Sequence, residues 1–321
     1  MYCPDIGVGC FKGSNRTFAD TSIIRFFNRW CPKIDYPVGL AICDKVNQNE
    51  TMRLLVTLSL LLASVAHAYK LHDAHLHYNE SVWKRLPADQ VIRFLVEHNI
   101  ERAVFSSTPD KGTEMLYEIA PDRVIPLTRP YRSNHDVLTW HHNPEIVEYT
   151  RQQAAKGIFR GFGEFHMWFY HLDGKSIMPE IMQIAAEQGW VLNAHTDIKA
   201  MEKLLEMQPT VNIIWAHCGF LVPADKVQAL IEKYPTAHCD MSFHEILTDE
   251  DDNLMPEWKA LMEKHPDRFM VAVDTFSEGR WGELQKHTDF IQEWLAQLSP
   301  RAAKLIAHGN VSRLFPLEKS K

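Results

Sequence analysis

The chain has 321 residues, of which 45% are hydrophobic and 23% charged, as in an ordinary globular protein. Its net charge is −7 and it holds no run of lysine or arginine, which argues against nucleic-acid binding through a basic surface. The unusual count is histidine, at 17. Histidine is the commonest metal ligand and titrates near neutral pH, so some of these residues are candidates for metal or proton-transfer chemistry, while most are expected to be surface residues.

Residues 52–68 have the layout of a secretory signal peptide. Arg53 precedes an apolar run over Leu54–Val65, and small residues around Ala68 mark a cleavage point. The run is too short to span a bilayer, which takes about 20 residues, so we expect no stable membrane insertion after cleavage. A buried core helix is the alternative explanation. The pattern predicts an exported protein, periplasmic or secreted, whose mature chain begins at Tyr69.

Residues 1–51 precede this segment and show no sustained periodicity. A signal peptide normally stands at the start of a protein, so we expect translation to start at Met52 and residues 1–51 to be a non-native or disordered extension. They contain four of the six cysteines. Only Cys218 and Cys239 remain beyond them, which does not make a disulfide framework, and we expect both to be buried free thiols.

Residues 69–321 alternate short apolar strands with longer amphipathic helices. This alternation predicts a parallel sheet with helices outside it, and the segment has the roughly 250 residues of a (β/α)8 TIM barrel. An open doubly wound sheet is the alternative, but no Gly-x-Gly-x-x-Gly turn follows the first strand. The expected strands are Tyr69–Tyr78, Arg102–Ser107, Val124–Tyr131, Ile158–His166, Trp190–Asp197, Val211–Cys218, Ala237–Phe243 and Phe269–Thr275. The expected helices include Asp89–His98, Pro144–Lys156, Met178–Gln188, Ala224–Tyr234 and Leu284–Leu298.

Polar residues gather where the predicted strands end, which is where barrel enzymes build their sites. His75 and His77 end the first strand. Strand side chains alternate faces, so both imidazoles point into the barrel mouth and Leu76 points outward. Two imidazoles on one face can chelate a single metal ion. A His-x-His pair alone is a weak signal, and its place at a strand end gives it weight.

Four further residues end later strands. His195 ends the fifth strand and His217 the sixth, although a lone histidine there is more often a satisfied core or surface group. Asp274 follows a buried run in the eighth strand, where a carboxylate is costly unless it is paired or metal-bound. Glu164 ends the fourth strand after Gly-Phe-Gly. These glycines permit a close approach of backbone or ligand, and tight packing alone is the alternative explanation.

In combination these motifs resemble the amidohydrolase superfamily. The resemblance covers essentially all of residues 69–321, and the order, spacing and strand assignment of its motifs agree. The closing segment is similar to the signature of the amidohydrolase-related branch, also called amidohydrolase 2. The matching motifs are Asp73-x-His75-x-His77, the histidine that ends strand five, Ala216-His217-Cys218-Gly219, Val273-Asp274-Thr275 and Gly309-Asn310-Val311-Ser312-Arg313-Leu314-Phe315.

The resemblance implies a metal-dependent hydrolase with one or two divalent ions, zinc being the expected metal. His75 and His77 would hold the first ion with Asp274, which would also accept the proton of a metal-bound water. His195 would be a ligand to the same ion or to a second one, and His217 a second-site ligand or a catalytic acid. A bound Zn²⁺ lowers the pKa of its water to about 7, which makes hydroxide available at neutral pH.

The fourth strand departs from the pattern that the resemblance implies. Many relatives place a bridging carboxylate there, often on a modified lysine. This sequence has no lysine at that strand end, so Glu164 would have to bridge the two ions.

Substrate-binding residues are expected after strands three and four. Arg129 and Tyr131 share one face at the end of strand three and are candidates to bind a substrate carboxylate. His166 and Trp168 follow strand four and are candidates to line the pocket. Packing of these aromatic residues as a cap over the barrel is the alternative.

The sequence therefore predicts an exported hydrolase that uses a metal-activated water on an amide, lactone, ester or related bond of a small molecule. Non-oxidative decarboxylation of a small carboxylic acid is the first alternative, because the same branch resembles one-metal decarboxylases. A metal-binding protein without catalysis is the second. The sequence leaves a homo-oligomer open.

Overall fold

The computed structural model describes residues 68–243 and 247–317. The predicted extension over residues 1–51 and nearly all of the predicted signal peptide lie outside this range. No helix among the described residues is both long and apolar enough to cross a membrane.

Eight parallel strands follow one another around a barrel in chain order. Backbone hydrogen bonds from Ala74 N to the carbonyl of Val271 (3.0 Å) and from Asp274 N to the carbonyl of His75 (2.7 Å) join the last strand segment to the first. The barrel is thereby closed at the level of His75. The strands are β1 (Leu71–Leu76), β2 (Ile100–Phe105), β3 (Val124–Thr128), β4 (Gly161–Met167), β5 (Val191–Thr196), β6 (Ile213–Trp215), β7 (Ala237–Asp240) and β8 (Phe269–Met270).

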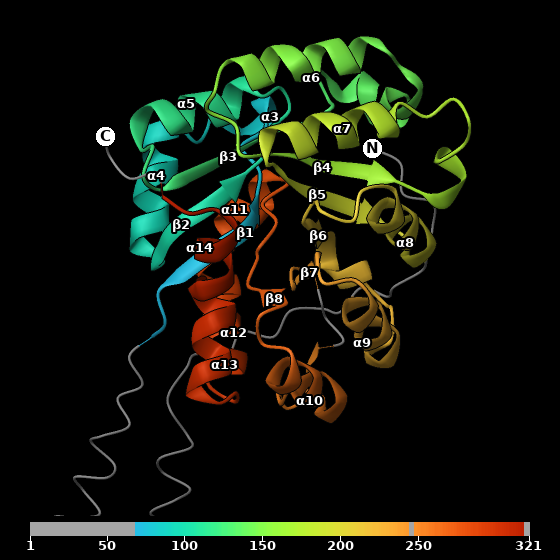
Figure 1. The fold of residues 1–321 in the computed structure, drawn as a ribbon. Helices are drawn as coiled ribbons and strands as arrows, with labels where there is room; N and C mark the ends of the chain where they lie inside the picture. Colours follow the sequence, from blue (N-terminus) through green and yellow to red (C-terminus); the bar gives the residue numbers. More distant parts are fainter. Residues whose placement is uncertain (1–67, 244–246, 318–321) are drawn as a thin grey trace, which may run out of the picture. The chain divides into compact units, whose positions relative to one another are not determined.

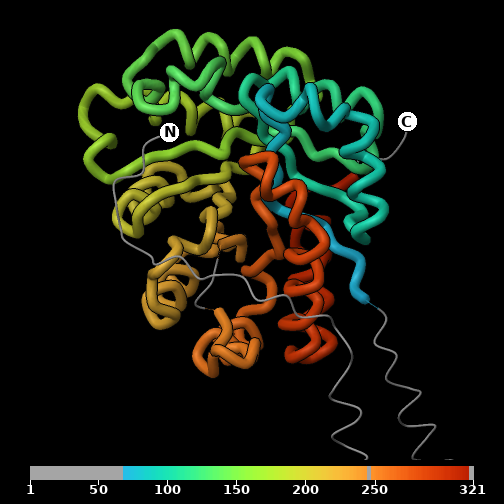
Figure 2. The backbone as a smooth tube through the Cα atoms, turned by 180° about the vertical axis from the view of Figure 1, so that it is seen from behind, coloured from blue at the N-terminus to red at the C-terminus, as the bar shows by residue number. Residues whose placement is uncertain are grey.

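Helices lie outside the strands, and the helices at the C-terminal end of the chain lie beside β1 (Figures 1 and 2). The α-helices are α3 (Glu80–Trp83), α4 (Ala88–Glu97), α5 (Lys111–Ile119), α6 (Glu145–Ala155), α7 (Met178–Gln188), α8 (Ile198–Met207), α9 (Ala224–Lys233), α10 (Pro256–Lys264), α11 (Glu278–Gly282), α12 (Leu284–Leu295), α13 (Pro300–Lys304) and α14 (Asn310–Leu314). Single helical turns are η1 (Asn134–Leu138), η2 (Trp140–His142), η3 (Phe169–His171), η4 (Ala216–Gly219) and η6 (Leu305–Gly309).

Local sequence explains where the helices begin and end. In α8, the carboxylate of Asp197 accepts hydrogen bonds from the N–H groups of Lys199 and Ala200, which have no partner inside the helix. Helix α7 stops at Gly189, whose left-handed φ of 64° an L-residue adopts only with strain. Helix α12 buries Leu284, Ile291, Trp294 and Leu295 on one stripe, so packing against the barrel holds it in place.

The predicted TIM barrel is confirmed, and each of the eight predicted strands overlaps an observed one. Most of the observed strands are shorter, because hydrogen bonding of the parallel ladder ends before the polar strand ends. The clearest case is β8, which is regular only over Phe269–Met270, whereas the prediction extended it to Thr275. Residues 271–275 leave the ladder to bring Asp274 into the barrel mouth, with a left-handed φ of 58°.

The expectation of free thiols is wrong. Cys218 and Cys239 form a disulfide bond, with their Cα atoms 4.8 Å apart. Strands β6 and β7 are neighbours in register, with Trp215 opposite Cys239, so the residues just past β6 lie against β7. The sequence shows two isolated cysteines 21 positions apart, and only the pairing of the two strands reveals that they meet.

We expect the folded protein to contain this disulfide after oxidative folding. Denaturation without reductant should expose no thiol reactive to an alkylating agent, and reduction should expose both. The double variant Cys218→Ala/Cys239→Ala should lose about 3 kcal/mol of unfolding free energy, because the bond no longer closes a loop of this length in the unfolded chain. Quantitative alkylation of both cysteines in the oxidised, unfolded protein would contradict the assignment.

Candidate metal centre

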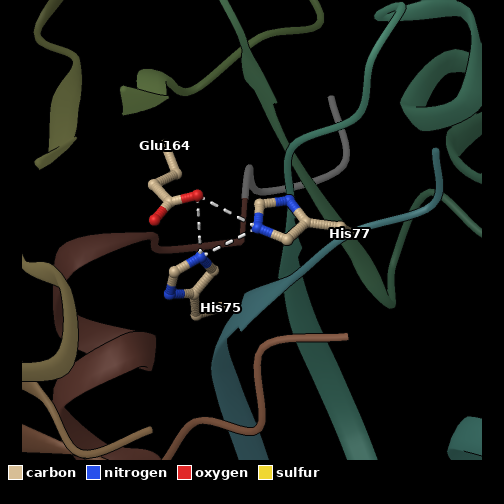
Figure 3. Close-up of side chains that lie close together, drawn as sticks. All are labelled: His75, His77 and Glu164. Atoms are coloured by element: carbon tan, nitrogen blue, oxygen red, sulfur yellow. Dashed lines mark hydrogen bonds and ion pairs between the residues drawn. The ribbon is translucent and has the colours of Figure 1, made fainter. Parts of the chain in front are cut away.

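His75 in β1 and His77 just after it turn their Nε2 atoms toward one another in the barrel mouth (Figure 3). His75 Nε2 and His77 Nε2 are 3.0 Å apart, and both rings are fully buried. Glu164 Oε2 lies 3.2 Å from His77 Nε2 and 3.6 Å from His75 Nε2. The alternation of side chains along β1 thus brings both imidazoles to one point, as the sequence predicts.

The other nitrogen of each ring is held by a group that accepts a hydrogen bond. His77 Nδ1 donates to the carbonyl oxygen of Ser106 at 2.6 Å, and His75 Nδ1 donates to Asp240 Oδ2 at 3.1 Å. A carbonyl oxygen accepts only, so the proton of neutral His77 is on Nδ1 and the lone pair of Nε2 faces the site. Such partners behind the ring are the usual means by which a protein orients histidine ligands.

Asp274 completes this group of atoms. Its Oδ1 is buried and has no hydrogen-bond partner, and it lies 3.2 Å from His77 Nε2 and 3.8 Å from His75 Nε2. An unpartnered buried carboxylate oxygen beside two imidazole lone pairs is unfavourable unless a cation lies between them. The donor set of His75, His77 and Asp274 therefore fits a divalent metal ion, and two nitrogens with one carboxylate oxygen suit zinc.

Glu164 lies inside β4 instead of at its end, because the strand continues to Met167. The register of β4 against β5 shifts between Gly163 and Phe165, and such an irregularity re-aims a side chain. A Cβ on Gly163 would meet the carbonyl oxygen of Asn193 at 2.2 Å, so the glycine permits a close approach of the β5 backbone. Of the two expected partners of the glycine, backbone or ligand, the structure therefore shows backbone.

Both carboxylate oxygens of Glu164 already have donors. Arg129 holds Oε2 with its NH2 group at 2.8 Å, and the Nε of the same guanidinium donates to the Glu164 carbonyl at 2.9 Å. His195 Nδ1 lies 2.8 Å from Oε1. Arg129 and Glu164 are a buried ion pair, with side-chain exposures of 8% and 4%.

His195 and His217 both reach the same end of the barrel as the β1 histidines. Their ring centroids are 4.9 Å apart, and the centroid of His217 is 5.3 Å from that of His75. His217 Nε2 lies 3.6 Å from Glu164 Oε1 and 3.9 Å from Asp274 Oδ2, while its Nδ1 is 2.8 Å from Ser242 Oγ. All six predicted ligands therefore converge on one end of the barrel, and their roles as ligands stay a prediction.

Burial and charge act against each other on the ionisable groups. Burial works to lower the pKa of His75, but Asp274, Glu164 and Asp240 outweigh it and raise that pKa well above its usual value. Burial works to raise the pKa of Glu164, but His75 and its other neighbours hold it well below the usual range. The pKa of Asp240 falls to about 2 despite burial, chiefly because of His75. Without a metal ion, the ionised carboxylates therefore favour a proton on His75, and a metal ion would take the place of that positive charge.

The predicted substrate residues are engaged within the protein. Arg129 would have to leave Glu164 in order to bind a substrate carboxylate. Tyr131 is buried, and its hydroxyl lies 2.9 Å from His166 Nδ1 and accepts from His166 N at 2.7 Å. Burial lowers the pKa of His166 to about 3, so its ring is neutral. Trp168 lies 5.8 Å from His195 between ring centroids, at the edge of the site.

Sequence reasoning missed the residues that support the ligands. Asp240 ends a buried run in β7, as Asp274 does after β8. The argument that a carboxylate after a buried strand must be paired or metal-bound therefore applies to Asp240 as well. Asp73, part of the first motif but without an assigned role, accepts from His75 N and Val273 N, and burial raises its pKa to about 8. Ser106 and Ser242 carry no signal in the sequence, because serine is common and their positions become informative only when strands are paired.

A parallel eight-stranded barrel with histidines and carboxylates facing one another at the carboxyl ends of its strands defines a class of metal-dependent barrel enzymes. The family model described as amidohydrolase matches residues 72–317. The chain belongs to this family, in the amidohydrolase-2 branch of the amidohydrolase superfamily. The family comprises enzymes that act on small molecules, and the clusters of histidine with acidic residues in this chain are able to bind a metal ion.

One solved structure shares the fold at low sequence identity, and a second is similar to a lesser degree. A protein of Agrobacterium tumefaciens in its apo form is 12% identical with a TM-score of 0.52, and the match covers 78% of this chain and 97% of that one. A sugar phosphate isomerase/epimerase from Parabacteroides distasonis is 9% identical with a TM-score of 0.45, over 71% of this chain and 96% of that one. No curated protein sequence matches this chain.

Proposed function

We propose that the protein is a metal-dependent hydrolase that acts on an amide, lactone, ester or related bond of a small molecule. The observation that carries the proposal is the pair of Nε2 atoms 3.0 Å apart, together with the unpartnered Oδ1 of Asp274. His75, His77 and Asp274 would hold the ion, with His195 or His217 as a further ligand. When bound, a zinc ion would activate a water molecule near neutral pH and polarise the substrate carbonyl.

The residues of the chain divide the proton transfers between them. Asp274 is ionised and buried, so its Oδ2 is the group that accepts the proton of the attacking water. His217, held through Nδ1 by Ser242, has its Nε2 3.9 Å from Asp274 Oδ2. The proton that Asp274 takes from the water would pass to His217 Nε2 and from there to the leaving group, so Asp274 and His217 both return to their starting state. His75, His77 and Asp274 are each at most 5% exposed, so electrostatic interactions among them are weakly screened by water.

Arg129 supports a single ion over two. Its guanidinium, 2.8 Å from Glu164 Oε2, already supplies the positive charge that this carboxylate needs. A second cation bridged by Glu164 would stand against this fixed charge in a buried site, where repulsion is weakly screened. The same engagement disfavours decarboxylation, because Arg129 was the group expected to bind a substrate carboxylate. We therefore propose one ion and a hydrolytic reaction.

Metal removal tests this proposal. We expect the protein as purified to contain about one zinc per chain, and dialysis against a chelator followed by zinc to remove and restore hydrolysis of aryl esters, lactones or anilides in a screen. Metal content is measured by mass spectrometry on the same samples. Two ions per chain would overturn the single-ion assignment. Release of CO2 from carboxylic acids without any hydrolysis would favour the decarboxylase alternative. A protein that binds metal but turns over no substrate in either the hydrolysis or the decarboxylation screen would favour the non-catalytic metal-binding protein.

We further propose that the protein is exported. The signal-peptide pattern at residues 52–68 motivates this, and the Cys218–Cys239 disulfide supports it because such bonds persist in oxidising compartments. The expected result is a mature N-terminus at Tyr69 when the protein is isolated from its natural source and sequenced. A mature N-terminus upstream of Met52 would contradict both the export signal and the proposed translation start.

A further inference from the structure

Four aromatic side chains, which we call the aromatic collar, stand at the carboxyl ends of four different strands: Trp168, Phe220, Phe243 and Phe276. They contact the site histidines or one another. The ring of Phe220 lies 4.3 Å from His217 and 5.0 Å from His195, and Phe243 lies 5.6 Å from His217, all between centroids. Phe276 lies 5.7 Å from Phe243. The collar therefore borders the proposed metal centre directly.

The backbone gives independent support at two of these positions. Phe220 and Phe243 have left-handed φ values of 61° and 52°, which are rare for bulky residues. Strain of this kind persists where the surrounding structure enforces it, and it clusters at functional sites. Here it turns both rings toward His217, whose own φ is 57°.

Exposed apolar residues continue the collar outward. Phe276 is about half exposed, and Leu221, next to Phe220, is 75% exposed. Phe169 and Tyr170, next to Trp168, are exposed as well. Large apolar groups left open to water around one mouth indicate a surface that a ligand covers.

The charges at the site match an uncharged ligand. Arg129 donates to Glu164 through two of its nitrogens. Arg280 lies over the ring of Phe243, 4.1 Å from its centroid, and donates to the backbone carbonyls of Val273 and Asp274. Both guanidinium groups that are bonded to site residues are thus committed to the protein itself.

We propose that the part of the substrate that does not react is an uncharged aromatic or similarly flat apolar group, packed against Phe220 and Phe243. This inference rests on the proposed function, since it assumes that the reacting bond lies at His75, His77 and Asp274. It deepens that function by naming the substrate class. The preferred substrates are acyl compounds whose apolar ring lies in the collar, and compounds that carry a carboxylate on that ring are disfavoured.

A matched set of metal-binding probes tests the collar without turnover. Acetohydroxamate, benzohydroxamate and 4-carboxybenzohydroxamate share one chelating head group and differ only in what they present to the collar. Their dissociation constants for the zinc-loaded protein are measured by calorimetry. We expect the phenyl group to tighten binding at least about tenfold over the methyl group, because its apolar surface is buried. The carboxylate should remove most of that gain.

Variants then locate the gain. Phe220→Ala and Phe243→Ala should each lose most of the ratio by which benzohydroxamate binds more tightly than acetohydroxamate, while Phe220→Leu should retain part of it. Ile119→Ala, an exposed truncation at the end of α5, is the matched control and should change neither constant. Equal affinity for the first two probes, or tighter binding of the carboxylated one, overturns the collar proposal. Failure of all three probes to bind would instead overturn the proposed metal site.

Discussion

The turnover rate of the variant Asp274→Asn should fall by a factor of about 10² to 10⁴, while its metal content should fall much less. Asparagine keeps the size and one acceptor oxygen, so His75, His77 and the amide oxygen still offer three ligand atoms. It cannot accept the proton of the attacking water, and general-base catalysis is typically worth that factor. Metal content and rate are measured on the same sample, with a substrate from the hydrolysis screen.

Asp289→Asn provides the control, because Asp289 lies exposed on α12, where its carboxylate accepts a hydrogen bond from Gln285. It should match the wild type in both measurements. A near-normal rate at near-normal occupancy in Asp274→Asn would remove Asp274 from the mechanism and leave it as a packed carboxylate. Complete loss of metal in Asp274→Asn would show that Asp274 acts chiefly as a metal ligand. That result would contradict the expectation that its larger contribution is to accept the proton of the water.

The second large effect is expected on stability. Arg129→Met keeps the length and apolar volume of the side chain but leaves Glu164 buried without its cation. Breaking a buried ion pair from one side typically costs about 3–5 kcal/mol, because the remaining charge is uncompensated. We expect a loss of this size in the free energy of unfolding by denaturant at pH 8, where histidine in the unfolded chain is neutral.

A second variant separates loss of the pair from a packing defect. Arg129→Met/Glu164→Gln removes both charges, so it should be more stable than Arg129→Met alone. Arg93→Met removes an exposed i,i+4 pair with Asp89 and should change stability little. If Arg129→Met is as stable as the wild type, or if the double variant is less stable than the single one, then the charges of Arg129 and Glu164 are not coupled as the structure indicates.

The fold was accessible from the sequence because the two periodicities that specify it are local. Apolar strands of a few residues alternate with helices such as α7, whose predicted bounds of Met178–Gln188 are those observed. Side-chain alternation within β1 also determined that His75 and His77 face the same way. These properties depend only on the order of residues along one element.

The supporting residues were beyond the sequence because they depend on which strands are neighbours and in what register. Ser106 reaches His77 from β2, and Asp240 reaches His75 from β7 across the closed barrel. The strand that carries Glu164 was predicted. The register shift of this strand depends on the pairing of β4 with β5, and the ion pair of Glu164 with Arg129 depends on the position of β3. No local pattern encodes these contacts.

The disulfide and the aromatic collar show the same division. Cys218 and Cys239 meet only because β6 and β7 pair in register, so counting cysteines predicted thiols where the tertiary structure forms a bond. Phe220 and Phe243 follow different strands, and their common neighbour His217 is set by closure of the barrel. The sequence by itself determined the barrel and the residues able to do chemistry. The tertiary structure decided which atoms of those residues face one another, because distances across a closed barrel depend on strand order and register.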